Sequence, residues 1–211
     1  MNLKQRVKGI LTLLDEHYPS TRCYLEHQEP YQLLIATILS AQCTDDRVNI
    51  VTKDLFQKYK SIEDFAFANL TELEQDIRST GYYHSKAKGI IGSMTLLLNQ
   101  YNKVLPSDID ELTKFPSVGR KTANVIRTHI FNIPSIVVDT HVSRLSSLLG
   151  LVKEKDPVKI EFRLMEILPR KNWSPFNTQI IAHGRAVCIA RRPRCMDCFL
   201  SGCCEHFERM F

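Results

Sequence analysis

The sequence lacks any apolar run that approaches the ~18 residues needed to span a bilayer, which excludes a transmembrane protein. Its N-terminal stretch also lacks the uninterrupted apolar core of a signal peptide, so we expect a protein of the cytoplasm or the nucleoid. Internal repeats, low-complexity segments and Gly/Ser-rich linkers are absent too. With 211 residues, 44% hydrophobic and 24% charged, the chain can bury a sizeable core as one domain or two compact lobes.

No stretch in which apolar and polar residues alternate is long enough to predict a strand. Apolar residues instead recur at helical spacing, and residues typical of helix termini flank them. These termini are marked by Pro30, Thr44–Asp45, Ser61, Thr71 with Glu74, Pro106–Ser107, Gly150, Asp156–Pro157 and Ser174–Pro175. We therefore predict an all-α fold.

Acidic residues are scarce in two parts of the chain. Residues 112–153 contain six Lys or Arg, and Asp139 is the one acid among them. A second acid-free basic stretch covers residues 185–194 and includes Arg191 and Arg192. The net charge of +5 is modest, but this clustering favours a polyanionic partner such as nucleic acid. The alternative is a solvated basic surface without a partner.

Cysteine is rare before residue 188 and then abundant: five of the seven cysteines lie in the last 24 residues. An odd count and terminal clustering argue against a disulfide framework and favour a metal or cluster site. Cys188, Cys195, Cys198 and Cys204 are separated by six, two and five residues, with Cys203 as an extra thiol. Four thiolates can hold either a [4Fe–4S] cluster or a zinc ion, and spacing alone leaves both open.

Residues 108–128 predict a short helix, a tight turn with Pro116 and Gly119, and a second helix that begins at once. Backbone N–H groups of such a turn, together with the N-terminus of the following helix, form an anion site that suits a DNA phosphate. Val118, Gly119 and Arg120 are the candidate contacts. The alternative is a purely structural corner between two helices.

Together these motifs resemble the helix–hairpin–helix DNA glycosylase superfamily, and within it the endonuclease III branch. The matching segments are 38–45, 81–87, 112–126, 138–141 and the cysteine cluster, and they follow one another in the family's order from about Leu3 to Cys204. The resemblance implies two helical lobes with DNA bound between them. Residues 22–133 would form a six-helix lobe with the hairpin at about 108–128, and residues 1–21 and 134–211 a discontinuous lobe with the cluster at 188–204.

The resemblance further implies a bifunctional DNA glycosylase and AP lyase of base excision repair. Such an enzyme removes oxidised pyrimidines and cleaves the abasic strand by β-elimination. Lys121 is the implied nucleophile, whose amine displaces the damaged base at the sugar C1′ and forms a Schiff base. Asp139 is implied to accept a proton or to stabilise the cationic sugar. The structural alternatives are a solvated surface lysine and a helix N-cap.

The same resemblance assigns residues that open the duplex. Gln42 is implied to fill the gap left by the extruded base, and Tyr82 to wedge between bases, where the family commonly has leucine. The alternative for Tyr82 is a core aromatic, which we expect for Tyr83. Further implied DNA contacts are His141, Arg144, Arg191 and Arg192. One departure is Ser117, at a hairpin position where the family usually carries glycine, a residue that suits a left-handed backbone.

The implied cofactor is a [4Fe–4S] cluster on Cys188, Cys195, Cys198 and Cys204. The implied partner is double-stranded DNA with damaged bases or abasic sites, bound by a monomer with no membrane association. Two alternatives stand beside this interpretation. One is a monofunctional mismatch glycosylase of the same superfamily, which would lack the lysine found at Lys121. The other is a non-catalytic DNA-binding module stabilised by zinc.

Overall fold

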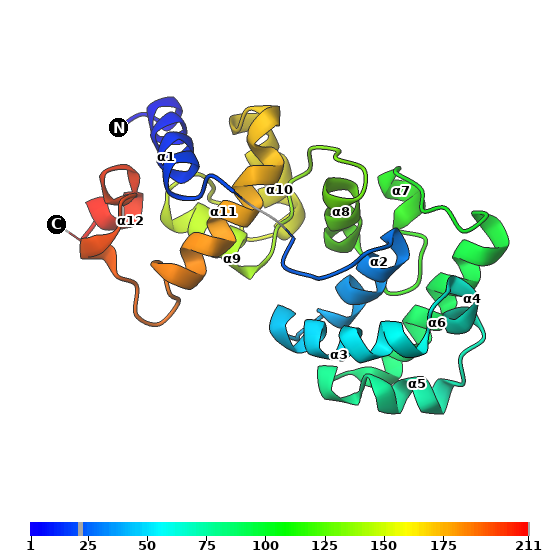
Figure 1. Cartoon of the computed structure of the whole chain (residues 1–211). Coiled ribbons are helices and arrows are strands. Elements are labelled where there is room, and N and C mark those ends of the chain that lie inside the picture. The colour runs from blue at the N-terminus through cyan, green and yellow to red at the C-terminus, as the bar shows by residue number, and fades with distance from the viewer. Residues whose placement is uncertain (21–22, 211) are drawn as a thin grey trace. The chain divides into compact units, whose positions relative to one another are not determined.

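The structure is a computed structural model that describes residues 1–20 and 23–210. Within these ranges the chain forms twelve α-helices and four short 3₁₀ helices, and it contains no strand (Figure 1). The prediction of an all-α fold is confirmed. The chain divides into two compact units, one made of Cys23–Ile133 and the other of Met1–Arg22 with Pro134–Phe211.

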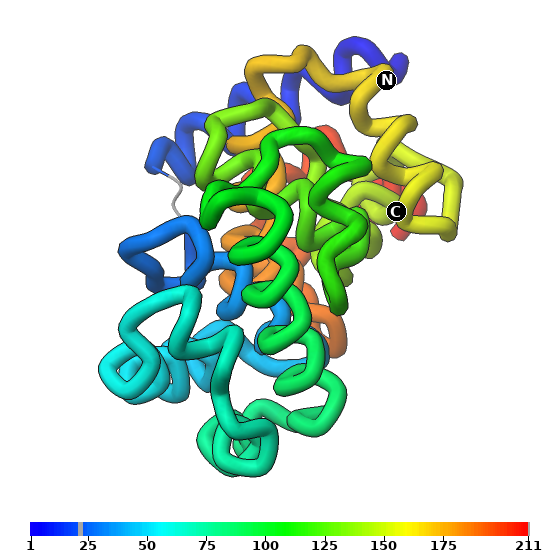
Figure 2. The backbone as a smooth tube through the Cα atoms, turned by 90° about the vertical axis from the view of Figure 1, so that its right-hand side faces the viewer, coloured from blue at the N-terminus to red at the C-terminus, as the bar shows by residue number. Residues whose placement is uncertain are grey.

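The unit Cys23–Ile133 is built around one central helix. Its α-helices are α2 (Pro30–Leu39), α3 (Asp45–Lys58), α4 (Ile62–Ala66), α5 (Leu70–Asp76), α6 (Tyr83–Gln100), α7 (Ile109–Leu112) and α8 (Arg120–His129), with the 3₁₀ helix η1 (Arg78–Thr80) before α6. Helix α2 is almost entirely apolar, and every residue after Pro30 is buried. It packs against α3, α6 and α8 and so forms the middle of the core. The turns of α6 can be followed in green in Figure 2.

The other unit joins the first helix to the last third of the chain. It contains α1 (Leu3–His17), α9 (Thr140–Leu148), α10 (Pro157–Ile167), α11 (Trp173–Ala186), α12 (Glu205–Glu208) and the 3₁₀ helices η2 (Arg170–Asn172), η3 (Cys195–Asp197) and η4 (Ser201–Cys203). Helix α1 packs on α11 and η4, and its buried side chains Val7, Ile10, Leu11 and Leu14 share a core with residues from Ile136 onward. The buried Arg6 binds Glu208 through its Nη2 atom (2.7 Å) and pairs with Glu205 (3.6 Å), which ties α12 to α1.

Most of the predicted helix termini are confirmed. Thr44 caps α3 by accepting the backbone N–H of Arg47, and Ser61 caps α4 in a reciprocal pair with Asp64. Pro30 occupies the first turn of α2, as its fixed φ angle favours. Gly150 follows α9 with a φ of 74°, which a residue without Cβ adopts readily. The capping groups named in the sequence therefore start and stop these helices.

Three predicted helix starts are wrong, two of them because a competing residue caps the helix and the third because a 3₁₀ helix precedes it. Asn69 caps α5, so Thr71 lies inside the helix and forms no capping box. Asp108 accepts the N–H groups of Asp110 and Glu111, so α7 begins after Pro106–Ser107. Helix α11 begins at Trp173 because η2 leads directly into it. The Ser174 hydroxyl instead accepts the backbone N–H of Ser135 at 3.4 Å.

Candidate active site

The helix–hairpin–helix consists of α7, the turn that follows it, and α8. Phe115 and Val118 anchor the turn, because both side chains are buried in the core of this unit. The backbone N–H of Val118 donates to the Phe115 carbonyl at 3.1 Å, which closes the turn. Gly119 then caps α8 in an extended conformation, and a Cβ built on it would meet no atom within 4 Å. Space is therefore open beside Gly119, at the start of α8.

Ser117 has a φ of 62°, a left-handed conformation in which a side chain costs conformational energy. Helix α6 holds this residue in place. A Cβ on Gly89 would lie 2.2 Å from the Ser117 hydroxyl, so only glycine permits this approach. The Ser93 hydroxyl also donates to the Pro116 carbonyl at 2.8 Å. The serine is thus accommodated by a matching glycine on the neighbouring helix, and the hairpin is fixed against α6.

Lys121 is the second residue of α8, and its side chain is exposed. Ala123 and Ile126 direct the opposite face of α8 into the core, which fixes the helix and leaves the lysine on the outside. The first N–H groups of a helix have no partner within it, and they carry partial positive charge. The amine therefore lies beside a site that attracts an anion such as a phosphate.

Asp139 caps α9. Its Oδ1 atom accepts the backbone N–H of Val142 at 2.7 Å, and the half-buried side chain belongs to the unit that includes the C-terminal part of the chain. The prediction that this residue is an N-cap is confirmed. The bond uses one oxygen of a carboxylate that has two, so capping and a chemical role for the other oxygen are compatible.

His141 and Arg144 lie on α9 and contact their own unit. A Cβ on Gly184 would come within 2.4 Å of His141 Nδ1, so α9 and α11 pack closely at this glycine. The Arg144 guanidinium donates to the Cys188 carbonyl at 2.7 Å and to the Cys188 sulfur at 3.6 Å. Arg144 thus holds the start of the cysteine loop.

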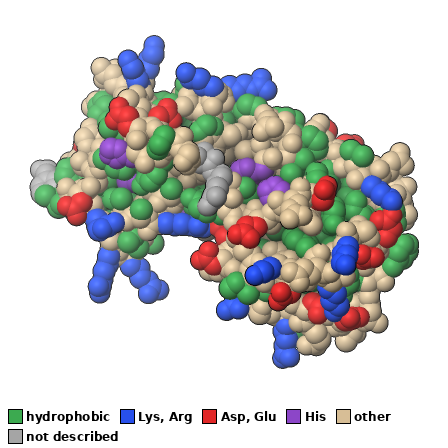
Figure 3. Space-filling view, viewed as in Figure 1, with side chains coloured by type: hydrophobic (Ala, Val, Ile, Leu, Met, Phe, Trp, Pro, Cys, Tyr) green, Lys and Arg blue, Asp and Glu red, His purple; other side chains and the backbone are tan. Residues whose placement is uncertain are grey.

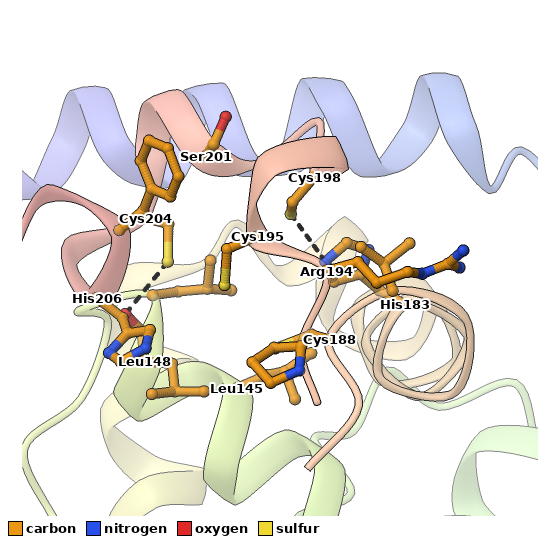
Figure 4. A pocket seen from close by; sticks show the side chains of 14 residues that line it. Leu145, Leu148, His183, Cys188, Arg194, Cys195, Cys198, Ser201, Cys204 and His206 are labelled. Atoms are coloured by element: carbon orange, nitrogen blue, oxygen red, sulfur yellow. Dashed lines mark hydrogen bonds between the residues drawn. The ribbon is translucent and has the colours of Figure 1, made fainter. Parts of the chain in front are cut away.

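Four of the five C-terminal cysteines line one hollow, shown from close by in Figure 4. Its empty space, open solvent included, is about 450 Å³. The cysteines are Cys188, Cys195, Cys198 and Cys204, and apolar side chains such as Leu145, Leu149 and Phe207 form much of the remaining wall. The fifth, Cys203, is not part of the lining: its sulfur lies 2.7 Å from the position of a Cβ on Gly9, against α1.

The donor set suits an iron–sulfur cluster in kind and number, because four thiols surround a single hollow with apolar walls. Burial raises the pKa of the Cys198 and Cys204 thiols, and the neighbouring thiols raise it further. Thiolates crowded in this way need a cationic centre to balance their charge. In the part of the chain that the structure describes, no three His, Cys, Asp or Glu side chains converge as ligands of one metal ion.

His183 on α11 supports this loop, and the sequence alone did not single it out. It is buried, and its Nε2 atom lies 3.4 Å from the Cys198 sulfur, as the dashed line in Figure 4 shows. Its Nδ1 atom lies 3.4 Å from the hydroxyl of Tyr18, the residue that follows α1. Burial lowers the pKa of His183 to about 4, so the ring is neutral at pH 7 and has one donor and one acceptor nitrogen.

The basic stretch forms a loop whose base lines the hollow, through Val187, Cys188, Pro193 and Arg194. The Arg194 backbone N–H donates to the Val187 carbonyl at 3.1 Å, and the Arg194 guanidinium binds the Ala186 carbonyl, which closes the base of the loop. Arg191 and Arg192 lie within the closed loop and are exposed. Lys and Arg side chains project at several places on the face drawn in Figure 3. The loop geometry thus presents two arginines to solvent.

Gln42 and Tyr82 are both exposed and both left-handed, with φ angles of 52° and 50°. Tyr82 is 65% exposed and does not belong to the core, so the core alternative is wrong for this residue. Tyr83, in contrast, is partly buried against the core, as expected. Left-handed conformations are unusual for residues with side chains, and they are enriched where strain serves function.

The chain matches the family described as HhH-GPD superfamily base excision DNA repair protein over residues 35–170. A protein of Synechocystis sp. named endonuclease III is 48% identical over 95% of this chain and 92% of its own length. A Bacillus subtilis protein of the same name is 44% identical over 99% and 95%. A solved structure described as a trapped endonuclease III–DNA covalent intermediate has a TM-score of 0.94 and 43% identity, covering 100% of this chain and 99% of that one.

The helical fold, the hairpin and the family match define a base excision DNA repair protein of the helix–hairpin–helix superfamily. The full-length relatives identify the branch within it: the chain belongs to the endonuclease III family.

Proposed function

We propose that this chain is a bifunctional DNA glycosylase and AP lyase that removes oxidised pyrimidines from double-stranded DNA and cleaves the resulting abasic strand. The observation that carries the proposal is an exposed lysine, Lys121, directly after the hairpin in a chain of this family. A monofunctional mismatch glycosylase would lack this amine, and a non-catalytic module would not need it. The solved relatives described as covalent and non-covalent complexes with DNA support the bifunctional enzyme.

In the proposed reaction the neutral Lys121 amine attacks the sugar C1′, the bond to the damaged base breaks, and the base leaves with the electron pair. Loss of the amine proton and opening of the sugar ring give a Schiff base, from which β-elimination breaks the strand on the 3′ side. Asp139 would accept a proton or stabilise positive charge on the sugar with the oxygen that its capping bond does not use. The N-terminus of α8, through Gly119 and Arg120, would hold a backbone phosphate.

The proposal is tested with the purified protein and two duplexes, one with thymine glycol and one with a pre-formed abasic site. We expect release of the oxidised base from the first duplex and strand cleavage of both. Base release without any strand cleavage would favour the monofunctional alternative. DNA binding with neither reaction would favour the non-catalytic module.

We further propose that Cys188, Cys195, Cys198 and Cys204 hold a [4Fe–4S] cluster. When bound, the cluster would supply four metal–thiolate bonds that cross-link the loop and hold Arg191 and Arg192 toward DNA phosphates. Arg144 and His183 would position two of the ligands, since each lies at a ligand sulfur. The orientation of Cys203 toward α1 supports Cys204 as the fourth ligand.

Two neighbouring cysteines give a matched comparison for this site. Anaerobically purified wild type should contain about four irons per chain and absorb broadly in the visible region. Cys204→Ser should lose most of the iron, because a ligand is removed. Cys203→Ser should keep it, because that sulfur faces α1. Iron and zinc analysis of the three proteins checks this, and stoichiometric zinc in wild type, or equal iron loss in both variants, would contradict the assignment.

Tyr82→Ala should slow base removal from a damaged duplex much more than cleavage at a pre-formed abasic site. The reason is that an abasic nucleotide has no base to unstack, so the wedge matters less there. Because the ring is exposed, the substitution should change the melting temperature little. Single-turnover rates on the two duplexes provide the measurement. Equal losses on both substrates would place Tyr82 outside base extrusion.

A further inference from the structure

The two candidate insertion residues lie on separate turns of the same unit. Gln42 follows the C-terminus of α2, and Tyr82 precedes α6 after the short helix η1. Both side chains are exposed and both backbones are left-handed, so neither turn is held by the burial of its insertion residue. Local strain of this kind persists only where surrounding contacts over-determine the backbone. Some other group must therefore fix the two turns.

Lys86, in the first turns of α6, contacts both of them. Its side chain is buried, with 4% of the residue exposed, and the Nζ atom donates to the carbonyls of Leu39 and Thr80 at 2.8 Å each. Leu39 ends α2 three residues before Gln42, and Thr80 ends η1 two residues before Tyr82. One ammonium group thus bridges the backbones that lead into the two turns.

The main chain of Lys86 adds a third contact. Its backbone N–H donates to the Tyr82 carbonyl at 3.1 Å, and the Ser85 hydroxyl donates to the same oxygen at 3.0 Å. The Tyr82 turn is therefore held on both sides, at Thr80 by the lysine side chain and at Tyr82 by the lysine main chain. The Gln42 turn is tied to the same residue through Leu39.

A lysine at this buried position needs a reason, because transferring an ammonium group from water into the protein interior costs free energy. Burial lowers the pKa of Lys86, and both of its acceptors are neutral carbonyls. A methionine would fill similar space without the cost of desolvating a charge. The ammonium offers what an apolar side chain cannot: several donors for carbonyls at helix ends, which have no partner within their helices and carry partial negative charge.

We propose that Lys86 is a positioning residue that locks the Gln42 and Tyr82 turns into one geometry for insertion into the duplex. Lys86 itself touches no reacting atom. The inference rests on the proposed function, because insertion matters only if the protein extrudes bases from DNA.

The test uses Lys86→Met and a control, Leu97→Ala, which removes a fully buried side chain from the same helix about three turns further on. Both variants should lower the melting temperature, since one leaves buried carbonyls unpaired and the other leaves a cavity. The measured quantity is the extrusion ratio, the rate of thymine glycol removal divided by the rate of abasic-site cleavage. Lys86→Met should lower this ratio about 10- to 100-fold, the scale of a misplaced positioning group, and Leu97→Ala should not.

A second arm asks whether Lys86 acts through the two turns. In a Gln42→Ala/Tyr82→Ala background, adding Lys86→Met should change the extrusion ratio little, because the effects of residues that act as one unit are not additive.

Hydrogen exchange of the DNA-free protein gives a readout without catalysis. Lys86→Met should speed exchange in segments 40–44 and 80–85 more than elsewhere, and Leu97→Ala should not.

Three results would overturn the inference: an unchanged extrusion ratio in Lys86→Met, an equal loss of that ratio in Leu97→Ala, or unchanged exchange of both turns. A wild type that releases no base and cuts no abasic site would instead overturn the proposed function, while the exchange measurement still decides whether Lys86 fixes the turns.

Discussion

Lys121→Gln is expected to abolish both the borohydride-trapped protein–DNA adduct and strand cleavage, because glutamine has no amine that can form a Schiff base. The side chain is exposed near the start of α8, so the substitution removes no buried contact. Surface substitutions of this kind usually change stability by no more than ~0.5 kcal/mol. DNA binding and the melting temperature should therefore stay near the wild-type values while both chemical readouts vanish.

The control is Lys53→Gln, which removes an exposed helical lysine from α3 of the same unit. It should leave trapping and cleavage intact. Trapping is measured as a covalent band on a denaturing gel, and cleavage as a shortened strand. Undiminished trapping in Lys121→Gln would show that another amine is the nucleophile.

Asp139→Asn is expected to lower the single-turnover rate of base removal by at least ~10²-fold, the scale of a positioned acid–base group. That loss corresponds to about 2.7 kcal/mol of barrier. Stability should change little, since the asparagine Oδ1 atom can still accept the Val142 N–H that the aspartate now accepts. Asparagine and aspartate are similarly good N-caps, so the substitution separates the two roles of this residue.

Asp156→Asn provides the matched control for Asp139. Asp156 caps α10 in the same way, with its Oδ1 atom accepting the Lys159 N–H at 2.9 Å. This variant should keep both the wild-type rate and the wild-type melting temperature. If Asp139→Asn retained full activity, or lost activity only in proportion to unfolding, the capping role alone would account for the residue.

Much of the fold could be predicted because its signals are local. A nearly continuous apolar run after Pro30 predicts a central helix, and α2 is that helix. Short turn residues between two helical patterns predict the hairpin, and the structure places α7 and α8 on either side of it. Where the sequence offered competing caps, the prediction failed: Thr71 with Glu74 has the spacing of a capping box, but Asn69 lies two residues earlier and caps α5.

The contacts that support the candidate site could not be predicted, because they join residues far apart in the chain. Nothing near Lys86 in the sequence indicates that its amine reaches Leu39, 47 positions earlier. His183 is likewise an ordinary helical histidine until the fold brings Tyr18 and Cys198 to its two nitrogens. Cysteine spacing predicts four ligands with Cys204 as the fourth, but only the structure shows that Cys203 faces α1 while Cys204 lines the hollow. Residue types and spacing thus predict the candidate site residues, whereas the contacts that hold those residues in place depend on how distant parts of the chain pack.

During synthesis, helix α1 cannot bury its apolar face until the C-terminal part of the chain has been made. The apolar side chains of α1, including Ile10 and Leu14, are buried in a core whose other members all begin at Ile136. The buried core of the unit Cys23–Ile133 runs from Leu25 to Ile126, so it includes no residue of the C-terminal part of the chain. At the usual 5–20 residues per second, the 78 residues that follow Ile133 take roughly 4–16 s to be synthesised. Throughout that interval the apolar face of α1 has no native surface to cover it, and chaperones that bind exposed apolar helices have time to act. Pulsed hydrogen exchange during synthesis should show protection in α2 before α1, and simultaneous protection of both would contradict this order.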